Sequence, residues 1–361
     1  MHIPDGYLSP STCAATFAAA APFWYVASRK VGRMLNTKAV PLISVVSAFS
    51  FTVMMFNLPL PGGTTGHAVG MGIAAIVIGP WAAMLAVSIA LLVQAVFFGD
   101  GGILAFGANA LNMAIVGPLV AFGLYRLIAG TSALTSTRRV VAGAIAGYAA
   151  INVSALMAAI EFGIQPMLFH DASGAPLYAP YPLSIAVPAM MIGHITFAGL
   201  AELIITGGLV AYLQRFDVDL LKATAPGSAT GVGKGFANTW KTTRMLWAGL
   251  AALMIASPLG LLAAGTAWGE WGSEAFQSAA GRAEIAAASH NIAPPEGVPA
   301  GLETLSSFWT APFPDYAPAF MHSQSFGYIL SALVGGGLII LTFLALSALA
   351  SRLRHETPDA A

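Results

Sequence analysis

The first two residues, Met1 and His2, carry three nitrogen atoms that can close on one metal ion. These are the α-amine of Met1, the backbone amide nitrogen of His2 and one nitrogen of its imidazole. The amine and amide share a five-membered chelate ring, and the amide and imidazole share a six-membered ring. Both rings hold the nitrogens in one plane and leave a fourth in-plane position open. Planar nitrogen coordination suits Cu(II) and Ni(II), whereas Zn(II) prefers a tetrahedron and Mg(II) and Ca(II) prefer oxygen.

This chelate requires an unblocked amine at Met1. Initiator methionine is normally removed only before a small residue, so we expect Met1 to survive in front of the bulky His2. No positively charged leader precedes the first apolar stretch, and we therefore expect no cleavable signal peptide. A histidine near the start can also be there by chance, so the hypothesis depends on a fourth ligand elsewhere.

The candidate fourth ligand is His67, which follows the proline- and glycine-rich loop 58–66. Such residues allow tight non-helical backbone, which is tolerated at membrane depth only where it lines a site or is buried in protein. An ionisable residue at that depth is a functional hypothesis by default. The alternative is that His67 only caps the following helix. Asp5 is a candidate to hold a ring nitrogen of His2 or His67.

A second glycine-rich loop, residues 99–102, contains Asp100 and follows Gln94, and Asn109 lies just inside the next apolar segment. Asparagine and glutamine inside an apolar helix need hydrogen-bond partners and often orient metal ligands. Hydrogen bonds that hold one helix against another would explain these polar residues equally well. We expect the loops 58–66 and 99–102 to close over the metal.

His194 and Glu202 lie eight residues apart in one apolar segment, so both project from one face of a helix. A carboxylate inside a membrane span must be paired or meet water. A proton relay or an inner metal site would use both residues. We favour structural pairing or a contact with a partner subunit, because Glu202 is expected in the cytoplasmic half, far from the proposed site.

The composition indicates a membrane protein that crosses the bilayer several times. Of the 361 residues, 57% are hydrophobic and only 8% are charged, which a soluble globule would not tolerate. The net charge is zero, so bulk electrostatics gives no case for binding nucleic acid. The single cysteine, Cys13, excludes an internal disulfide and a thiolate-rich metal site.

The apolar runs predict an all-α fold, a seven-helix bundle followed by a two-helix transmembrane hairpin. We expect a metal-binding membrane domain at 1–215, a flexible cytoplasmic linker at 216–243 and a hairpin domain at 244–361 with an acidic external loop at about 265–325. The segment 67–79 is too short to cross alone, because a span needs about 20 residues. The candidate hydrophobic helices are 11–28, 39–57, 67–79, 80–98, 103–127, 139–163, 183–213, 244–264 and 326–350.

The distribution of basic residues predicts the orientation of the chain. With the N-terminus outside, fourteen of the fifteen lysines and arginines fall in cytoplasmic connections and only Arg282 falls outside. We therefore expect an extracytoplasmic N-terminus, a cytoplasmic C-terminus, and Met1, His2 and His67 facing the side from which a nutrient metal arrives.

Motifs of energy-converting and bond-breaking enzymes are missing from the sequence. The stretch 231–235 is no ATP-binding Walker loop, because Ser228 stands where its first glycine belongs and Gly235 follows Lys234 where serine or threonine is required. No zinc-protease helix or nucleophile elbow occurs. We expect a transporter component without an ATP site. A proton-coupled secondary permease that uses His194 and Glu202 is the less favoured alternative.

The chain resembles the CbiM/NikM family, the substrate-binding membrane subunits of cobalt and nickel energy-coupling-factor (ECF) ABC transporters. The resemblance covers roughly residues 1–215. It rests on Met1-His2-Ile3-Pro4-Asp5-Gly6-Tyr7-Leu8, on Gly62-Gly63-Thr64-Thr65-Gly66-His67, and on Gln94, Gly101-Gly102 and Gly107-Ala108-Asn109. In that family the terminal amine, the amide and imidazole of the second residue, and a loop histidine hold the metal. These positions match Met1, His2 and His67 here.

The C-terminal part resembles the small auxiliary subunit of the same systems, here fused to the first part. The similarity rests on Ser257-Pro258-Leu259-Gly260-Leu261 and Phe313-Pro314-Asp315-Tyr316, and the usual Pro-Asp-Gly-Leu-Glu reads Pro299-Ala300-Gly301-Leu302-Glu303. The family implies a transmembrane coupling subunit and two cytoplasmic ATPase subunits as partners, in the lipid of a prokaryotic cell membrane.

Two observations favour nickel as the transported metal, with cobalt for cobalamin synthesis as the alternative. The start Ile3-Pro4-Asp5-Gly6 resembles the nickel members, and a planar all-nitrogen site suits Ni(II) better than Co(II).

Overall fold

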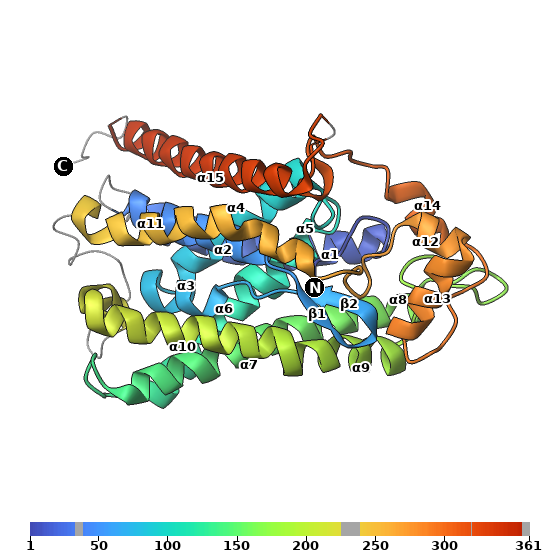
Figure 1. The fold of residues 1–361 in the computed structure, drawn as a ribbon, viewed down its shortest axis with the longest axis horizontal. Helices are drawn as coiled ribbons and strands as arrows, with labels where there is room; N and C mark the ends of the chain where they lie inside the picture. Colours follow the sequence, from blue (N-terminus) through green and yellow to red (C-terminus); the bar gives the residue numbers. More distant parts are fainter. Residues whose placement is uncertain (33–38, 225–238, 319, 356–361) are drawn as a thin grey trace.

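The computed structural model describes residues 1–32, 39–224, 239–318 and 320–355. Most helices run along the long axis of the molecule, and the orange segment that contains α12, α13 and α14 gathers at one end (Figure 1). The N-terminus lies between these helices, close to the β1–β2 hairpin. The first residues of the chain are therefore part of the interior.

Several helices in the first half of the chain begin at proline or end at glycine. Pro80 starts one of them and follows Gly79, whose φ of 78° ends the helix before it. The bounds are α1 Pro10–Gly32, α2 Val40–Met54, α3 Met71–Ile78, α4 Pro80–Val93 and α7 Thr137–Gly163, with the short α8 Gln165–Leu168 after it.

Three of the longer helical rods contain a π-helical segment. Each π segment begins at or directly after a residue that the sequence singled out, namely Gln94, Asn109 and His194. π turns occur frequently at functional sites, because the wider turn re-aims neighbouring side chains. The rods are α4 with η2 Gln94–Phe98; α5 Phe106–Asn109, η3 Ala110–Val116 and α6 Gly117–Ala129; and α9 Leu183–Gly193, η4 His194–Ala198 and α10 Gly199–Phe216.

Six helices in the described part of the chain are long and apolar enough to cross a membrane. The polytopic helical fold class is thus confirmed, whereas a count of nine spans is not. The 15-residue α2 is apolar but shorter, and α3 has only eight residues, in agreement with a segment too short to cross alone. The six segments are 80–98, 106–129, 137–168, 183–216, 243–262 and 324–350.

The loop 58–66 folds into a small antiparallel hairpin, an exception to the all-α expectation. Strand β1, Leu58–Leu60, pairs with β2, Thr64–Gly66, and the turn η1, Pro61–Gly63, joins them. Gly62 and Gly63 have φ angles of 80° and 77°, which glycine adopts without strain. The hairpin ends directly before His67.

The expected linker 216–243 is described only at its ends. There η5, Val218–Thr224, follows α10, and α11, Thr239–Ala256, begins inside the expected linker range and continues into η6, Ser257–Leu262. Residues 225–238 lie outside the described residues. The last helix is α15, Gln324–His355. Both α11 and α15 pack against α2 of the first part.

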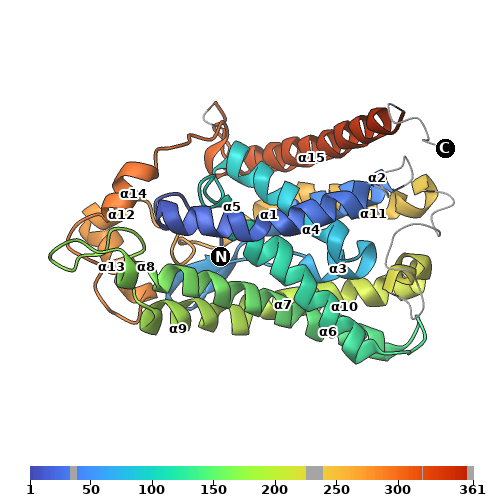
Figure 2. The ribbon, with the colours of Figure 1, turned by 180° about the vertical axis from the view of Figure 1, so that it is seen from behind.

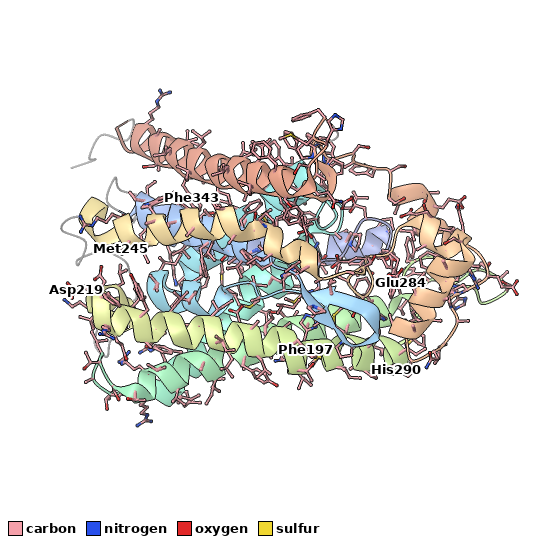
Figure 3. All side chains as sticks on the ribbon, viewed as in Figure 1. Phe197, Asp219, Met245, Glu284, His290 and Phe343 are labelled. Atoms are coloured by element: carbon pink, nitrogen blue, oxygen red, sulfur yellow. The ribbon has the colours of Figure 1, made fainter. Side chains whose placement is uncertain are left out.

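The segment between η6 and α15 folds over one end of the bundle. Its elements are α12 Ser273–Gln277, α13 Ala279–Ala288, α14 Ala300–Leu305 and η7 Pro314–Tyr316. The labelled Glu284 and His290 lie at this end, Asp219 lies at the opposite end, and Phe197 and Phe343 lie between the two ends (Figure 3). Seen from behind, α7 runs beside α6 and α9 (Figure 2), and it packs against both and against α10.

Candidate metal centre

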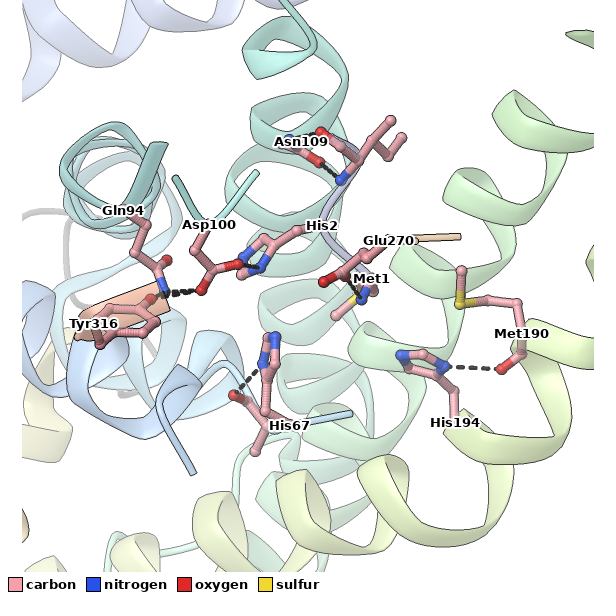
Figure 4. A network of polar contacts seen from close by, with 12 residues as sticks. Met1, His2, His67, Gln94, Asp100, Asn109, Met190, His194, Glu270 and Tyr316 are labelled. Carbon is pink, nitrogen blue, oxygen red and sulfur yellow. Dashed lines mark hydrogen bonds and ion pairs between the residues drawn. The ribbon is translucent and has the colours of Figure 1, made fainter. Parts of the chain in front are cut away.

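The N-terminus is buried and brings two of the predicted ligands beside the third. Met1 and His2 are 3% and 1% exposed, and His67 is 6% exposed. The rings of His2 and His67 face each other with centroids 5.0 Å apart (Figure 4). Met1, His2 and His67, from the two ends of a stretch of 67 residues, therefore meet at one place.

The nitrogens of the terminus lie against carboxylates. The six-membered chelate ring needs Nδ1 of His2, and this atom lies 2.5 Å from Oδ1 of Asp100. The amine of Met1 lies 3.2 Å from Oε1 of Glu270. Neither ring nitrogen of His2 has a hydrogen bond of good geometry to the described residues. Buried polar atoms usually have partners; Nδ1 of His2 has the Asp100 carboxylate beside it, and Nε2 has no hydrogen bond to the described residues.

Asn109 fixes the backbone that follows the chelating nitrogens. Its side-chain oxygen accepts a 2.8 Å hydrogen bond from the N–H of Ile3, and its amide nitrogen donates to the Ile3 carbonyl at 3.0 Å. The N–H of Gly102 donates to the same carbonyl at 2.8 Å. These bonds join the terminus to α5 and to the loop 99–102, as expected for an orienting residue.

Asp5 differs from its expected role. Its carboxylate accepts hydrogen bonds from the N–H groups of Ile103, Leu104 and Ala105 at 2.8–3.2 Å, and so holds the chain before α5. A side chain at Gly102 would overlap this carboxylate. The carboxylate at the His2 ring is that of Asp100, because the loop 99–102 passes over the terminus.

Asp100 is itself held by two further polar groups. Its Oδ2 accepts hydrogen bonds from Nε2 of Gln94 at 3.0 Å and from the Tyr316 hydroxyl at 2.5 Å. Gln94 also donates to the Tyr316 oxygen at 2.8 Å. Although burial alone would raise it, the contact with His2 holds the pKa of Asp100 below its ordinary value. The loop therefore presents a negative charge to the terminus.

His67 is fixed as a neutral imidazole. Its Nδ1 lies 3.1 Å from the Ala68 carbonyl, which suits the tautomer with the proton on Nδ1 and leaves Nε2 for a metal. Burial, together with the nearby His2 ring and the terminal amine, holds the pKa of His67 well below its ordinary value. A metal ligand must be deprotonated, so this environment prepares His67 for that role.

His194 and Glu202 have different hydrogen-bond partners. Nδ1 of His194 faces the Met190 carbonyl at 2.8 Å, and its Nε2 has no hydrogen bond to the described residues. Glu202 accepts backbone hydrogen bonds from Val69, Gly70 and Gly72. Glu202 is therefore close to the segment that carries His67, in contrast to the expectation that it lies far from the site.

Side chains alone do not make a metal cage here. Among the described residues, no three His, Cys, Asp or Glu side chains are grouped in a way that could hold a metal ion. The backbone nitrogens of Met1 and His2 are further candidate donors in the same segment as the His2 ring.

Two site residues were missed from the sequence, and both come from the C-terminal part. Glu270 was seen only as one acid of an acidic external loop, and Tyr316 only as part of a Phe-Pro-Asp-Tyr stretch. Tyr316 has a φ angle of 58°, and the residue before it, Asp315, has 52°. Side chains other than asparagine, aspartate and histidine rarely adopt such angles. No sequence signal gives that conformation or joins residues more than 200 positions apart.

Both parts of the chain match known protein families. Residues 2–220 match the CbiM family, described as the cobalt uptake substrate-specific transmembrane region, and residues 242–352 match the PDGLE domain. The fused nickel transport protein NikMN of Rhodobacter capsulatus is 59% identical over 340 residues, which are 94% of this chain and 95% of that protein.

Other similar proteins include a second fused chain and a solved structure. The probable fused nickel transport protein LarMN of Lactiplantibacillus plantarum is 42% identical over 359 residues, 99% of this chain and 98% of that protein. A crystal structure of a transition metal transporter superposes with a TM-score of 0.57 at 52% identity, covering 61% of this chain and 94% of the other.

Proposed function

The chain belongs to the CbiM family, and from that premise we propose that it is the membrane component that captures Ni(II) for uptake. The observation that carries the proposal is the buried terminus, in which the Met1 amine and the His2 ring lie beside the His67 ring. Four nitrogens would hold the metal: the amine, the His2 amide, Nδ1 of His2 and one nitrogen of His67.

Nickel is favoured over cobalt on two grounds. The donors are all nitrogen, and two fused five- and six-membered chelate rings impose a plane, which d⁸ Ni(II) accepts more readily than Co(II). Two similar chains that match nearly the whole length of this one are named nickel transport proteins.

Capture requires an exchange of partners at the terminus. The amine contacts Glu270, and Nδ1 of His2 contacts Asp100. Metal binding takes a proton from the amine and one from the amide and also uses Nδ1 of His2, so the amine must leave Glu270 and Nδ1 must leave Asp100. The two carboxylates then remain beside a bound cation and offset part of its charge.

The surrounding assembly follows from the family. The domain 1–215 would capture the metal, 216–243 would act as a cytoplasmic linker, and 244–361 would be the fused auxiliary part. We place the N-terminus on the extracytoplasmic side, where the metal arrives. Two cytoplasmic ATPase subunits would hydrolyse ATP. Together with a transmembrane coupling subunit they would reorient the chain and release the metal inward.

The test is metal titration of the purified full-length chain with a free Met1 amine. We expect one Ni(II) per chain, weaker binding of Co(II) and Zn(II), and the visible absorption of planar Ni(II). The variant His170→Ala serves as a control, because His170 has an exposed side chain and is not one of the proposed ligands. Binding of nickel at several equivalent weak sites, or a loss in the control alone, would contradict the proposal.

A further inference from the structure

Glu202 is a fully buried carboxylate in the first turn of α10. Its Oε2 accepts hydrogen bonds from the N–H groups of Val69 at 2.9 Å and Gly70 at 2.8 Å, and its Oε1 accepts from Gly72 at 3.1 Å. A buried carboxylate is costly unless its oxygens are satisfied. Here they are satisfied by one short stretch of backbone, residues 69–72.

This backbone stretch can approach the carboxylate because two of its residues are glycines. Gly70 has a φ of 73°, and a Cβ on it would lie 2.8 Å from the Phe49 ring. A Cβ on Gly72 would lie 2.5 Å from Oγ1 of Thr206 and 2.9 Å from Cα of Gly147. The N–H groups also belong to the start of α3, where the helix dipole favours a negative charge. The stretch is therefore clamped between α10 and α7.

The clamped stretch is continuous with the proposed ligand His67. Val69 is two residues beyond it, and the carbonyl of Ala68, between them, is the group that Nδ1 of His67 contacts at 3.1 Å. The position of that carbonyl selects the ring tautomer and the direction of the free nitrogen Nε2. A displacement of residues 69–72 would shift this carbonyl and thereby change the orientation of the His67 ring relative to His2.

We propose that Glu202 is a positioning residue for metal capture, which fixes residues 69–72 and thereby places the His67 imidazole opposite the terminal chelate. The inference rests on the proposed function. It assigns Glu202 no contact with the metal and no part in proton transfer. The alternative is that Glu202 only stabilises the start of α3. The two hypotheses differ in whether the effect of Glu202 on metal binding depends on His67.

The experiment is a double-mutant cycle on the full-length chain with a free Met1, read by Ni(II) titration. Glu202→Gln keeps the size of the side chain but turns an amide NH₂ toward N–H donors. We expect its Kd for Ni(II) to rise about ten- to a hundredfold, as for other groups that orient a ligand. In a His67→Ala background the same change should alter the residual Kd by less than about twofold, because the ring that Glu202 positions is gone.

A spectroscopic signature accompanies the loss of affinity. The terminal three-nitrogen chelate stays intact in Glu202→Gln, so the number of protons released on binding should not change. The visible absorption band of Ni(II) should move to longer wavelength, because a weaker oxygen donor replaces the imidazole in the fourth position. An unchanged band together with an unchanged Kd would overturn the proposal.

Two further variants separate positioning from stability. Glu161→Gln removes another buried carboxylate, on α7, whose Oε2 accepts a hydrogen bond from Asn112, and its Kd should stay within about twofold of the unmodified chain. If Glu202→Gln does not fold, Thr206→Val takes its place in the cycle, since Thr206 donates to Glu202 at 3.4 Å. An equal loss in both His67 backgrounds, or in Glu161→Gln, contradicts the inference. Absence of nickel binding by the unmodified chain would instead reject the proposed function.

Discussion

The two stretches that meet at the candidate metal centre are held in opposite ways. At the terminus, residues 1–6, the proposed ligand atoms themselves contact carboxylates: the Met1 amine contacts Glu270, and Nδ1 of His2 contacts Asp100. In the stretch 67–72 the backbone N–H groups that follow the ligand His67 donate hydrogen bonds to Glu202. The contacts of the terminus can therefore be exchanged for contacts with a metal, whereas the contacts between Glu202 and residues 69–72 can remain.

This difference divides the proposed chemistry between the two stretches. The terminus must lose protons and leave its carboxylate partners before it can bind a metal. The imidazole of His67 is already neutral, because burial and its neighbours lower its pKa. The terminus is thus the part that changes during capture, and the stretch 67–72 is the fixed part against which it closes.

The largest expected effect comes from removing either ring. His2→Ala removes a nitrogen and one chelate ring, so nickel binding should fall below detection. His67→Ala leaves the terminal chelate and opens only the fourth position, which predicts a rise in Kd of more than about a hundredfold with residual binding. Metal titration of both variants checks this. Equal residual affinity in the two variants would contradict the proposed asymmetry.

The pH dependence should come from the terminus alone. Binding releases a proton from the amine and one from the amide, so affinity should fall as pH falls, by up to about a hundredfold per pH unit for two protons. Because the pKa of His67 lies well below its ordinary value, that ring should add nothing near neutral pH. Calorimetry in buffers of different ionisation enthalpy counts the protons. A count of zero would exclude the chelate.

A smaller effect is expected where the terminus is held in place. Asn109→Ala leaves the buried N–H and carbonyl of Ile3 without the two bonds at 2.8 and 3.0 Å, at about 1 kcal/mol or more each. The Kd for Ni(II) should rise about tenfold or more. Asn152→Ala is a matched control, because Asn152 donates to the carbonyl of Tyr148 on its own helix. Similar losses in both variants would show that the effect is general.

The smallest effect should follow the loss of a single hydroxyl in the C-terminal part. Tyr316→Phe removes the hydrogen bond to Asp100 and the one accepted from Gln94, but it leaves the Asp100–His2 contact and the Gln94 bond to Asp100. A few-fold rise in Kd is expected, because Asp100 loses one of its two donors, a hydrogen bond of about 1 kcal/mol, while Gln94 still donates to it. A loss as large as that of His67→Ala would mean that the C-terminal part contributes a ligand.

Part of the site could be predicted because it depends on local chemistry. A chelate formed by Met1 and His2 follows from their order in the chain. The proline- and glycine-rich loop before His67 predicts backbone that is not helical. The partners of the carboxylates could not be predicted. Asp5 and Asp100 are both near the terminus, and only the path of loop 99–102 decides that Asp100 meets His2 while Asp5 meets the backbone.

The fold could be predicted where hydropathy alone decides, as in the long apolar helices. It could not be predicted where tertiary contacts decide. The π segments at 94–98, 110–116 and 194–198 change the helical register of the helices that contain them. A spacing of eight residues, as between His194 and Glu202, therefore no longer places two side chains on the same face. The hairpin at 58–66 and the docking of Glu270 and Tyr316 also depend on contacts between distant residues.

The most direct test of the account is the dependence of nickel binding on a free terminal amine. A short peptide placed before Met1 blocks the amine, and a protease that removes it completely restores the original start. Titration before and after cleavage of the same preparation should show no tight Ni(II) binding in the extended chain and one tight site in the cleaved chain. Tight binding that is the same in both forms would contradict the account.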